Sequence, residues 1–237
     1  MAYERKTIEH FGEAIRPGKY GFYLSRETYA IPNRKPTSHA PRELFSAEDW
    51  KALDWAYEDE EHTHHSDEYC TVQRERALEN FDLNMAFFAS IERSAFDDAV
   101  KHFIANNQRL KPVENLRKWD SKPGVYILVL DKYKQIYIGQ AWNIRKRVKQ
   151  HWNGTKQFDR LLWGSVEESV LSIDAFRALD TTRIFAAGST RASDLEAKLE
   201  AEFPRDFALN RIWGGDVQGL RAAFMLAEMK RRKLVDK

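Results

Sequence analysis

Residues 124–139 read GVYILVLDKYKQIYIG and decide the fold of this chain. Two apolar, β-branched runs flank the polar stretch 131–134, which predicts two short strands joined as a hairpin. If 131–134 form the turn, Tyr126 lies directly opposite Gly139. Tyr137 lies two positions before Gly139 on the same strand. Opposed residues share a face of a sheet, as do residues two apart on one strand. We therefore expect both tyrosines on one face, with Gly139 leaving space beside Tyr126.

The segment after the hairpin predicts a helix over residues 143–152. Its polar and apolar side chains each recur at four-residue steps, and side chains at this spacing share one face of a helix. The polar stripe is Asn143, Arg147 and His151, and the apolar stripe is Ile144, Val148 and Trp152. One stripe can be buried while the other points at a substrate. A third strand is expected at 183–187, followed by a helix over 193–203.

These elements carry a set of residues that resembles a known nuclease family. Ten residues separate Gly124-Val125-Tyr126 from Tyr137-Ile138-Gly139, and Arg147 follows eight residues after the second tripeptide. His151 comes four residues later, Glu196 lies on the helix after the third strand, and Phe203-Pro204 and Asn210 close the segment. Together they resemble the GIY-YIG nuclease family over residues 118–212.

The resemblance implies an α+β fold with a small three-stranded antiparallel sheet flanked by helices. It also implies a metal-dependent endonuclease that hydrolyses DNA phosphodiester bonds. The implied catalytic residues are Tyr126, Tyr137, Arg147, His151, Glu196 and Asn210. Glu196 would hold Mg²⁺ or Mn²⁺, since a single carboxylate with water and phosphate oxygens is typical of such sites. Tyr137 is the first choice of general base, with Tyr126 orienting the water or sharing the task.

Two features of this segment leave alternatives open. Glu196 follows Ser193 at the spacing of a capping box, so its carboxylate could serve the helix end alone. Glu200, one turn later, could be the metal ligand instead. Excision-repair members of the family carry lysine where this chain has Gln140. Glutamine hydrogen-bonds but does not neutralise a phosphate, so the chain departs from the repair subfamily there.

The formal net charge of +2 conceals a segregation of charge along the chain. Residues 1–110 hold 14 Lys and Arg against 20 Asp and Glu, whereas residues 111–160 hold 12 against 4. Such asymmetry predicts a polyanion site in the middle of the chain, although charged runs also solvate ordinary surfaces. The residues expected to contact nucleic acid are Arg145, Lys146, Lys149, Gln140 and Asn143.

The remainder of the chain predicts a mainly helical extension over residues 1–115 and a C-terminal helix within 216–237, on either side of a nuclease domain at 116–215. Ser46 opens one helix with an acid at the third position. Residues 72–106 predict two helices with a break near 90–94. The acidic balance of the extension makes it a poor DNA surface. It suits contact with the core, homodimer assembly or binding of a protein partner.

Composition excludes several other classes of protein. A lone Cys70 rules out a disulfide framework, and the cluster His62, His64 and His65 fits no standard zinc spacing. The longest apolar run, 125–130, is far shorter than the ~20 residues of a membrane helix. The N-terminus shows no secretory signal, so a cytoplasmic protein is expected. Two alternatives stay open: a nucleic-acid-binding module without catalysis, and a nuclease directed at RNA.

Overall fold

The hairpin predicted at 124–139 forms the centre of a four-stranded antiparallel sheet. The computed structural model describes residues 7–36, 42–154, 161, 166 and 169–211. The strands lie in the order β3 (Lys111–Pro112), β6 (Arg183–Gly188), β4 (Gly124–Leu130) and β5 (Gln135–Ala141). The mixed α+β class is confirmed, but the described sheet has a fourth strand because the short β3 pairs with β6. The helix predicted within 216–237 lies outside the described residues.

The register of the hairpin is the predicted one. Tyr126 pairs directly with Gly139, and Leu128 pairs with Tyr137. The turn is a short 3₁₀ segment that ends at Lys134, which adopts the left-handed conformation with φ 52°. Because a slip of one residue would turn each side chain to the other face, this register fixes both tyrosines on one side of the sheet.

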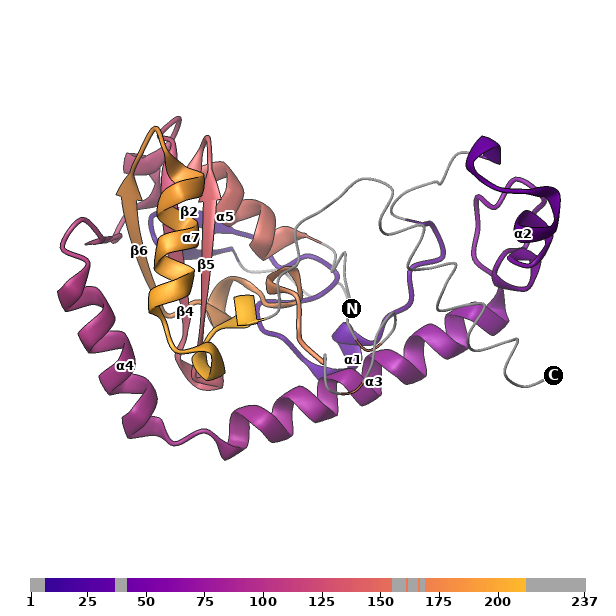
Figure 1. Cartoon of the computed structure of the whole chain (residues 1–237), viewed down its shortest axis with the longest axis horizontal. Helices are drawn as coiled ribbons and strands as arrows, with labels where there is room; N and C mark the ends of the chain where they lie inside the picture. The colour runs from indigo at the N-terminus through magenta and orange to yellow at the C-terminus, as the bar shows by residue number, and fades with distance from the viewer. Residues whose placement is uncertain (1–6, 37–41, 155–160, 162–165, 167–168, 212–237) are drawn as a thin grey trace.

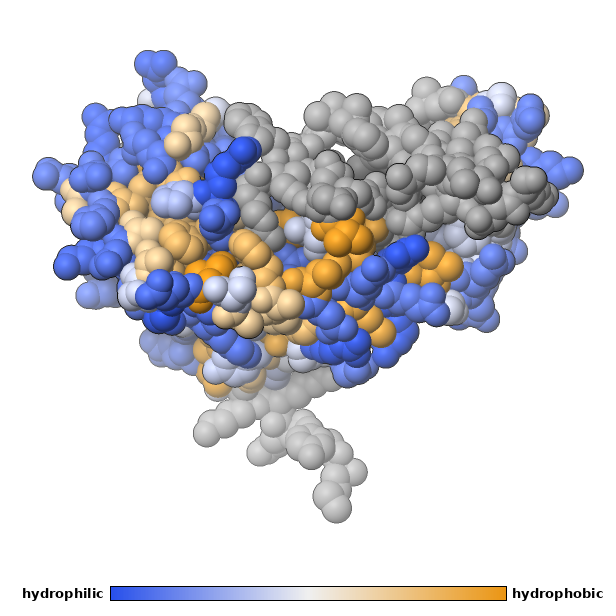
Figure 2. All heavy atoms as spheres, turned by 60° about the horizontal axis from the view of Figure 1, so that its bottom comes forward, coloured by the Kyte–Doolittle hydropathy of each residue, from blue (hydrophilic) through white to orange (hydrophobic). Residues whose placement is uncertain are grey.

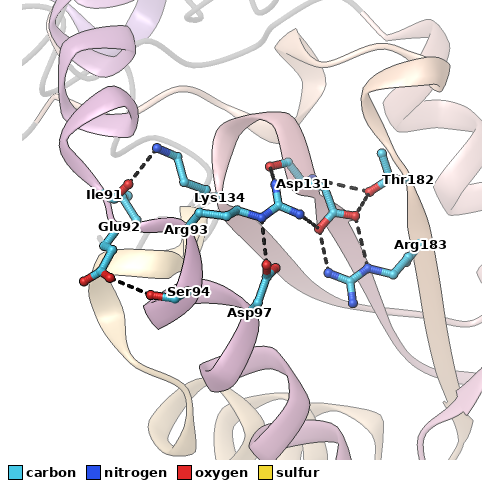
Figure 3. A network of polar contacts seen from close by, with 9 residues as sticks. All are labelled: Ile91, Glu92, Arg93, Ser94, Asp97, Asp131, Lys134, Thr182 and Arg183. Carbon is cyan, nitrogen blue, oxygen red and sulfur yellow. Dashed lines mark hydrogen bonds and ion pairs between the residues drawn. The ribbon is translucent and has the colours of Figure 1, made fainter.

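A polar network holds the turn of the hairpin in place (Figure 3). Arg183 on β6 donates to both carboxylate oxygens of Asp131, at 2.6 and 3.1 Å. Arg93 donates to the Asp131 carbonyl at 2.8 Å, and Lys134 donates to the Ile91 carbonyl at 2.7 Å. The turn of the hairpin is thus tied to β6 and to residues 91–93, where one long helix ends and the next begins.

Two hydrophobic cores lie on opposite faces of the sheet, since every residue of β4 is buried. Alternate residues of β4 enter different cores. The first set is Tyr126, Leu128 and Leu130, and the second is Val125, Ile127 and Val129. The first core packs against α5 (Ile144–Asn153), and the second against α4 (Arg93–Asn106) and α7 (Ala192–Glu202). In Figure 1, α7 crosses the near face of the sheet and α5 lies behind it.

Between residues 7 and 106, the described part of the N-terminal half contains two short strands and four α-helices. Its elements are β1 (Ile8–His10), β2 (Glu13–Ile15), α1 (Arg26–Tyr29), α2 (Ala47–Lys51), α3 (Asp67–Ser90) and α4. The predicted break between two long helices is confirmed at residues 91–92. The predicted cap is also confirmed, because the Ser46 hydroxyl accepts from the Asp49 amide at 3.0 Å. Short 3₁₀ turns occupy Arg42–Leu44, Asp54–Ala56, Leu116–Trp119, Asp131–Tyr133, Ile173–Ala175, Ala178–Asp180, Arg205–Phe207 and Leu209–Arg211.

Residues on both sides of position 115 share the same two cores. Ile15, Leu24 and Tyr29 join the first core, and α4 supplies aromatic residues to the second. Polar contacts add to this packing, because the Leu24 amide donates to the Asp180 carboxylate at 2.7 Å. The N-terminal half is therefore built into the sheet domain.

The face of the molecule along which α3 runs is polar at both ends, and hydrophobic residues gather in its middle (Figure 2). No helix among the described residues is long and apolar enough to cross a membrane.

The histidine cluster lies near α2, where the ring of His62 stacks between Trp50 and Tyr57 at centroid distances of 3.9 and 4.3 Å. The His65 ring hydrogen-bonds the Ala56 carbonyl at 3.1 Å, so these two histidines are packing groups.

Candidate active site

The two hairpin tyrosines meet at a position that only glycine fits. Their ring centroids are 6.2 Å apart, and Gly139 lies directly against Tyr126. A Cβ atom at Gly139 would lie 2.6 Å from the Tyr126 hydroxyl and 2.7 Å from the Tyr137 ring. Tyr126 is fully buried, whereas Tyr137 is half-buried. Of the two, Tyr137 is therefore the tyrosine that solvent or a substrate can reach.

Helix α5 brings Arg147 and His151 to the tyrosines, as the four-residue spacing predicts. The helix begins after Asn143, whose side chain accepts from the Lys146 amide at 2.9 Å. The apolar stripe of the helix is buried in the first core, which leaves the polar stripe against the tyrosines. Arg147 is exposed, whereas His151 is only 1% exposed.

A chain of hydrogen bonds runs inward from Tyr126. Its hydroxyl lies 2.7 Å from Nε2 of His151, and Nδ1 of His151 lies 2.6 Å from the Asp174 carboxylate. A carboxylate accepts only, so we assign the ring proton to Nδ1. Nε2 is then free to accept the proton of Tyr126.

Asp174 is the member of the site that sequence reasoning missed. It lies 23 residues after His151, in a 3₁₀ turn with no repeating pattern, and the sequence holds no signal that pairs the two. Buried Arg177 fastens this turn to the end of α5. It donates to the Gly154 carbonyl at 2.7 Å and to the Asp174 carbonyl at 3.1 Å.

Burial dominates the protonation of this group of residues. It raises the pKa of Tyr126 well above its usual value and that of Tyr137 to about 12, although Arg147 lowers both. Hydrogen bonding from Tyr126 also lowers the pKa of Tyr137. Burial lowers the pKa of His151, against the opposing effect of Asp174. The histidine is therefore neutral near pH 7 and able to accept a proton.

Glu196, on α7, acts on both tyrosines through its charge, which contributes to their raised pKa, and its capping interpretation is wrong. The helix begins at Ala192 after Arg191, so Ser193 lies inside the first turn and its hydroxyl contacts the Gln140 side chain at 3.1 Å. Burial, together with the charge of Glu200, raises the pKa of Glu196 to about 7, against hydrogen bonding from Gln140 and the charge of Arg147. A nearby cation would therefore lower this pKa and stabilise the charged form of the carboxyl.

Asn210 joins the site through Glu200. Its side-chain oxygen accepts from the Ile138 amide at 2.9 Å, and its nitrogen donates to the Ile138 carbonyl at 2.8 Å. The same nitrogen donates to Glu200 at 2.7 Å. Asn210 thus closes the free edge of β5 and holds the second carboxylate of α7.

Three of the residues predicted to contact nucleic acid have other partners. Arg145 donates to Glu13 at 2.6 and 3.1 Å and to Asp120 at 2.9 Å, and Lys149 donates to Glu13 at 2.9 Å. Glu13 itself is only 3% exposed at the side chain. Asn143 caps α5 and also donates to Asp120, at 2.8 Å. These contacts neutralise the charges of Arg145 and Lys149. Of the residues predicted to contact nucleic acid, exposed Lys146 and Gln140, which hydrogen-bonds Glu196, remain available.

Among the described residues, no group of three or more His, Cys, Asp or Glu side chains could hold a metal ion alone. A cation at Glu196 would therefore take one or two carboxylates and complete its shell with water and phosphate oxygens, which is common for Mg²⁺. No protein-family model matches this chain, and comparisons with curated proteins and with solved structures found no match either.

Proposed function

We propose that this chain is a metal-dependent endonuclease that hydrolyses DNA phosphodiester bonds through a GIY-YIG-type site. One observation carries the proposal. Half-buried Tyr137, exposed Arg147 and the raised-pKa carboxyl of Glu196 come from three separate elements and influence one another electrostatically. A basic group, a proton-transfer group and a metal-binding oxygen are what hydrolysis of a phosphodiester requires.

The order of the elements supports the same proposal. A hairpin carries the tyrosines, the next helix carries the arginine and histidine, and a third strand leads to the helix with the glutamate. This is the arrangement that the resemblance implies for a GIY-YIG core. Here β3 and the N-terminal half are added around it.

Arg147 is the group that would pair with the scissile phosphate. Arg147 is an exposed residue, and its pKa stays raised because the charges of the neighbouring tyrosines and Asp174, with a hydrogen bond to Tyr126, outweigh the effect of burial. A planar guanidinium can hold two phosphate oxygens at once and stabilise the charge that develops on them.

The tyrosines and His151 would remove the proton of the attacking water. Tyr137 is accessible and would take that proton while it passes its own to Tyr126. Tyr126 in turn hydrogen-bonds neutral His151, the final acceptor, at 2.7 Å. Asp174 is a positioning residue, because it keeps Nε2 of His151 free and stabilises the imidazolium that forms.

The residues of α7 fit a divalent metal ion. Glu196 would hold Mg²⁺ or Mn²⁺, and Glu200 lies one turn further along the helix. The mutual repulsion that raises the pKa of Glu196 is the kind that a bound cation relieves. When bound, the ion supplies a Lewis acid for the phosphate and the leaving oxygen.

A plasmid-nicking assay with Mg²⁺ tests the proposal. We expect Arg147→Ala and Glu196→Ala each to lower the rate by about 100-fold or more. The matched controls are Arg76→Ala, on half-buried Arg76 of α3, and Glu202→Ala, at an exposed position near the end of α7. Both should cut at the wild-type rate. Full activity in both site variants would refute the assignment. Salt-sensitive binding without cleavage by the wild type would instead indicate a binding module, and cleavage of RNA alone an RNA-directed nuclease.

A further inference from the structure

Trp142 is the most exposed large hydrophobic side chain of the described residues, at 86%. It lies between Ala141, the last residue of β5, and Asn143, the cap of α5. Both β5 and α5 carry residues of the candidate site. A tryptophan has roughly 150–250 Å² to bury, so leaving it in water is unfavourable unless a ligand covers it.

The backbone on either side of Trp142 is held firmly. Ala141 pairs with Gly124 in the sheet, and the Asn143 side chain binds both Asp120 and the first turn of α5. The next residue donates its amide to the Lys122 carbonyl at 3.2 Å. The indole is therefore presented from a firmly held backbone, which lowers the entropic cost of binding a flat ligand.

A basic groove lies at the same end of the sheet. It is open, has a volume of about 780 Å³, and is lined by Lys122, Gly188 and the first turns of α7, among others. Gly124 pairs with both Ala141 and Gly188, so the groove and Trp142 lie on neighbouring strand ends. Figure 1 shows the arrowheads of β5 and β6 at this common end.

The charges of the groove suit a phosphate chain. Its cations are Arg109, Lys122, Arg191 and Lys198, against one acid, Asp194. Arg191 pairs with Asp194 at 2.7 Å, but among the described residues neither Arg109 nor Lys122 has an ion-pair partner. A surface with spare positive charge, near an exposed aromatic ring on a firmly held backbone, matches the platforms that bind single-stranded nucleic acid.

We infer that Trp142 stacks on an unpaired base of the substrate while Lys122 and its groove hold the adjoining phosphates. This inference rests on the proposed function and narrows its substrate class. Inside a duplex, each base face is covered by its neighbours, so an exposed indole gains a partner only where a base is unstacked. The substrate is thus a nucleic acid with a single-stranded, bulged or branched segment beside the scissile phosphate.

Binding measured without divalent metal ions separates this inference from the nuclease proposal. The full chain is titrated against labelled single-stranded DNA, a flapped duplex and a fully paired duplex, with anisotropy as the readout. We expect Trp142→Ala to weaken binding of the first two by about 5- to 150-fold and of the duplex by less than 2-fold. Trp142→Phe should retain most of the affinity, and the control Tyr23→Ala, at an aromatic residue 53% exposed, should retain all of it.

Lys122→Ala gives a complementary pattern. It should weaken binding of all three substrates alike and reduce the salt dependence of log Kd by about one. Equal affinity of Trp142→Ala and wild type for the flapped duplex would overturn the inference and leave the nuclease proposal standing. Absence of nucleic-acid binding by the wild type would overturn both.

Discussion

The carboxyl of Glu196 provides a test of the site that needs no substrate. Its pKa is about 7 in the folded chain against an ordinary value of 4.5, because burial and Glu200 disfavour the charged form. A raised acid pKa means that the folded state binds the proton more tightly than the unfolded state does. The stability contributed by the protonated group is complete below pH 4.5 and is lost as the pH rises through about 7.

Glu196→Gln replaces the carboxyl with a neutral group of the same shape at every pH. The difference between 4.5 and about 7, at about 1.4 kcal/mol per pH unit, sets a ceiling of about 3 kcal/mol. Glu196 is half-buried, so solvent screening reduces this to about 1 kcal/mol. For a chain of this size, that corresponds to a rise in Tm of roughly 2–4 °C. The variant should therefore be more stable than wild type at pH 8 and equal to it at pH 4.

Thermal unfolding followed by circular dichroism, in EDTA at pH 4, 6 and 8, measures this effect. Glu202→Gln, an exposed acid on the same helix, is the control and should change stability by less than about 0.5 kcal/mol at each pH. Added Mg²⁺ should raise the Tm of wild type and leave that of Glu196→Gln unchanged. An equal or lower Tm for the variant at pH 8 would refute the claim that a destabilised carboxylate is held at the site.

Two further substitutions test the arrangement around the tyrosines. Asp174→Ala should slow cleavage about 10-fold or more. It should also move the acid limb of the pH–rate profile to lower pH, because loss of the carboxylate lowers the pKa of His151 further. An unchanged profile would show that Asp174 does not act through the histidine. Gly139→Ala should destabilise the fold by about 1–3 kcal/mol in urea denaturation, since its Cβ would lie 2.6 Å from the Tyr126 hydroxyl. The control Gly18→Ala has no atom within 4 Å of its added Cβ and should leave the free energy of unfolding unchanged. Similar losses of stability in both variants would refute the packing argument.

Sequence periodicity could predict the local elements of the site because each is specified by neighbouring residues. The hairpin register follows from the turn and the two apolar runs, and the face shared by Arg147 and His151 follows from their spacing. Asp174 could not be found this way, since its contact with His151 joins two segments through a turn without periodicity. The capping box at Ser193 failed for a different reason. The helix begins two residues too early for it, and helix ends are the least certain boundaries in a sequence.

Tertiary contacts also change what the charge of the central segment means. Its excess of cations predicts a polyanion site, but acid from the N-terminal half reaches into that segment. Glu13 binds Arg145 and Lys149 together, which is why a nearly buried carboxylate can remain ionised there: both cations lower its pKa against the effect of burial. Two of the cations adjacent to Arg147 therefore serve the packing of β2 on α5. The positive charge left for a phosphate chain lies at Lys146 and Arg147 on α5 and at the groove near Trp142. That groove is on the end of the sheet where β4 begins and β5 and β6 end. The path expected for a bound strand thus follows the strand ends, from Glu196 and Arg147 past Gln140 to Lys122.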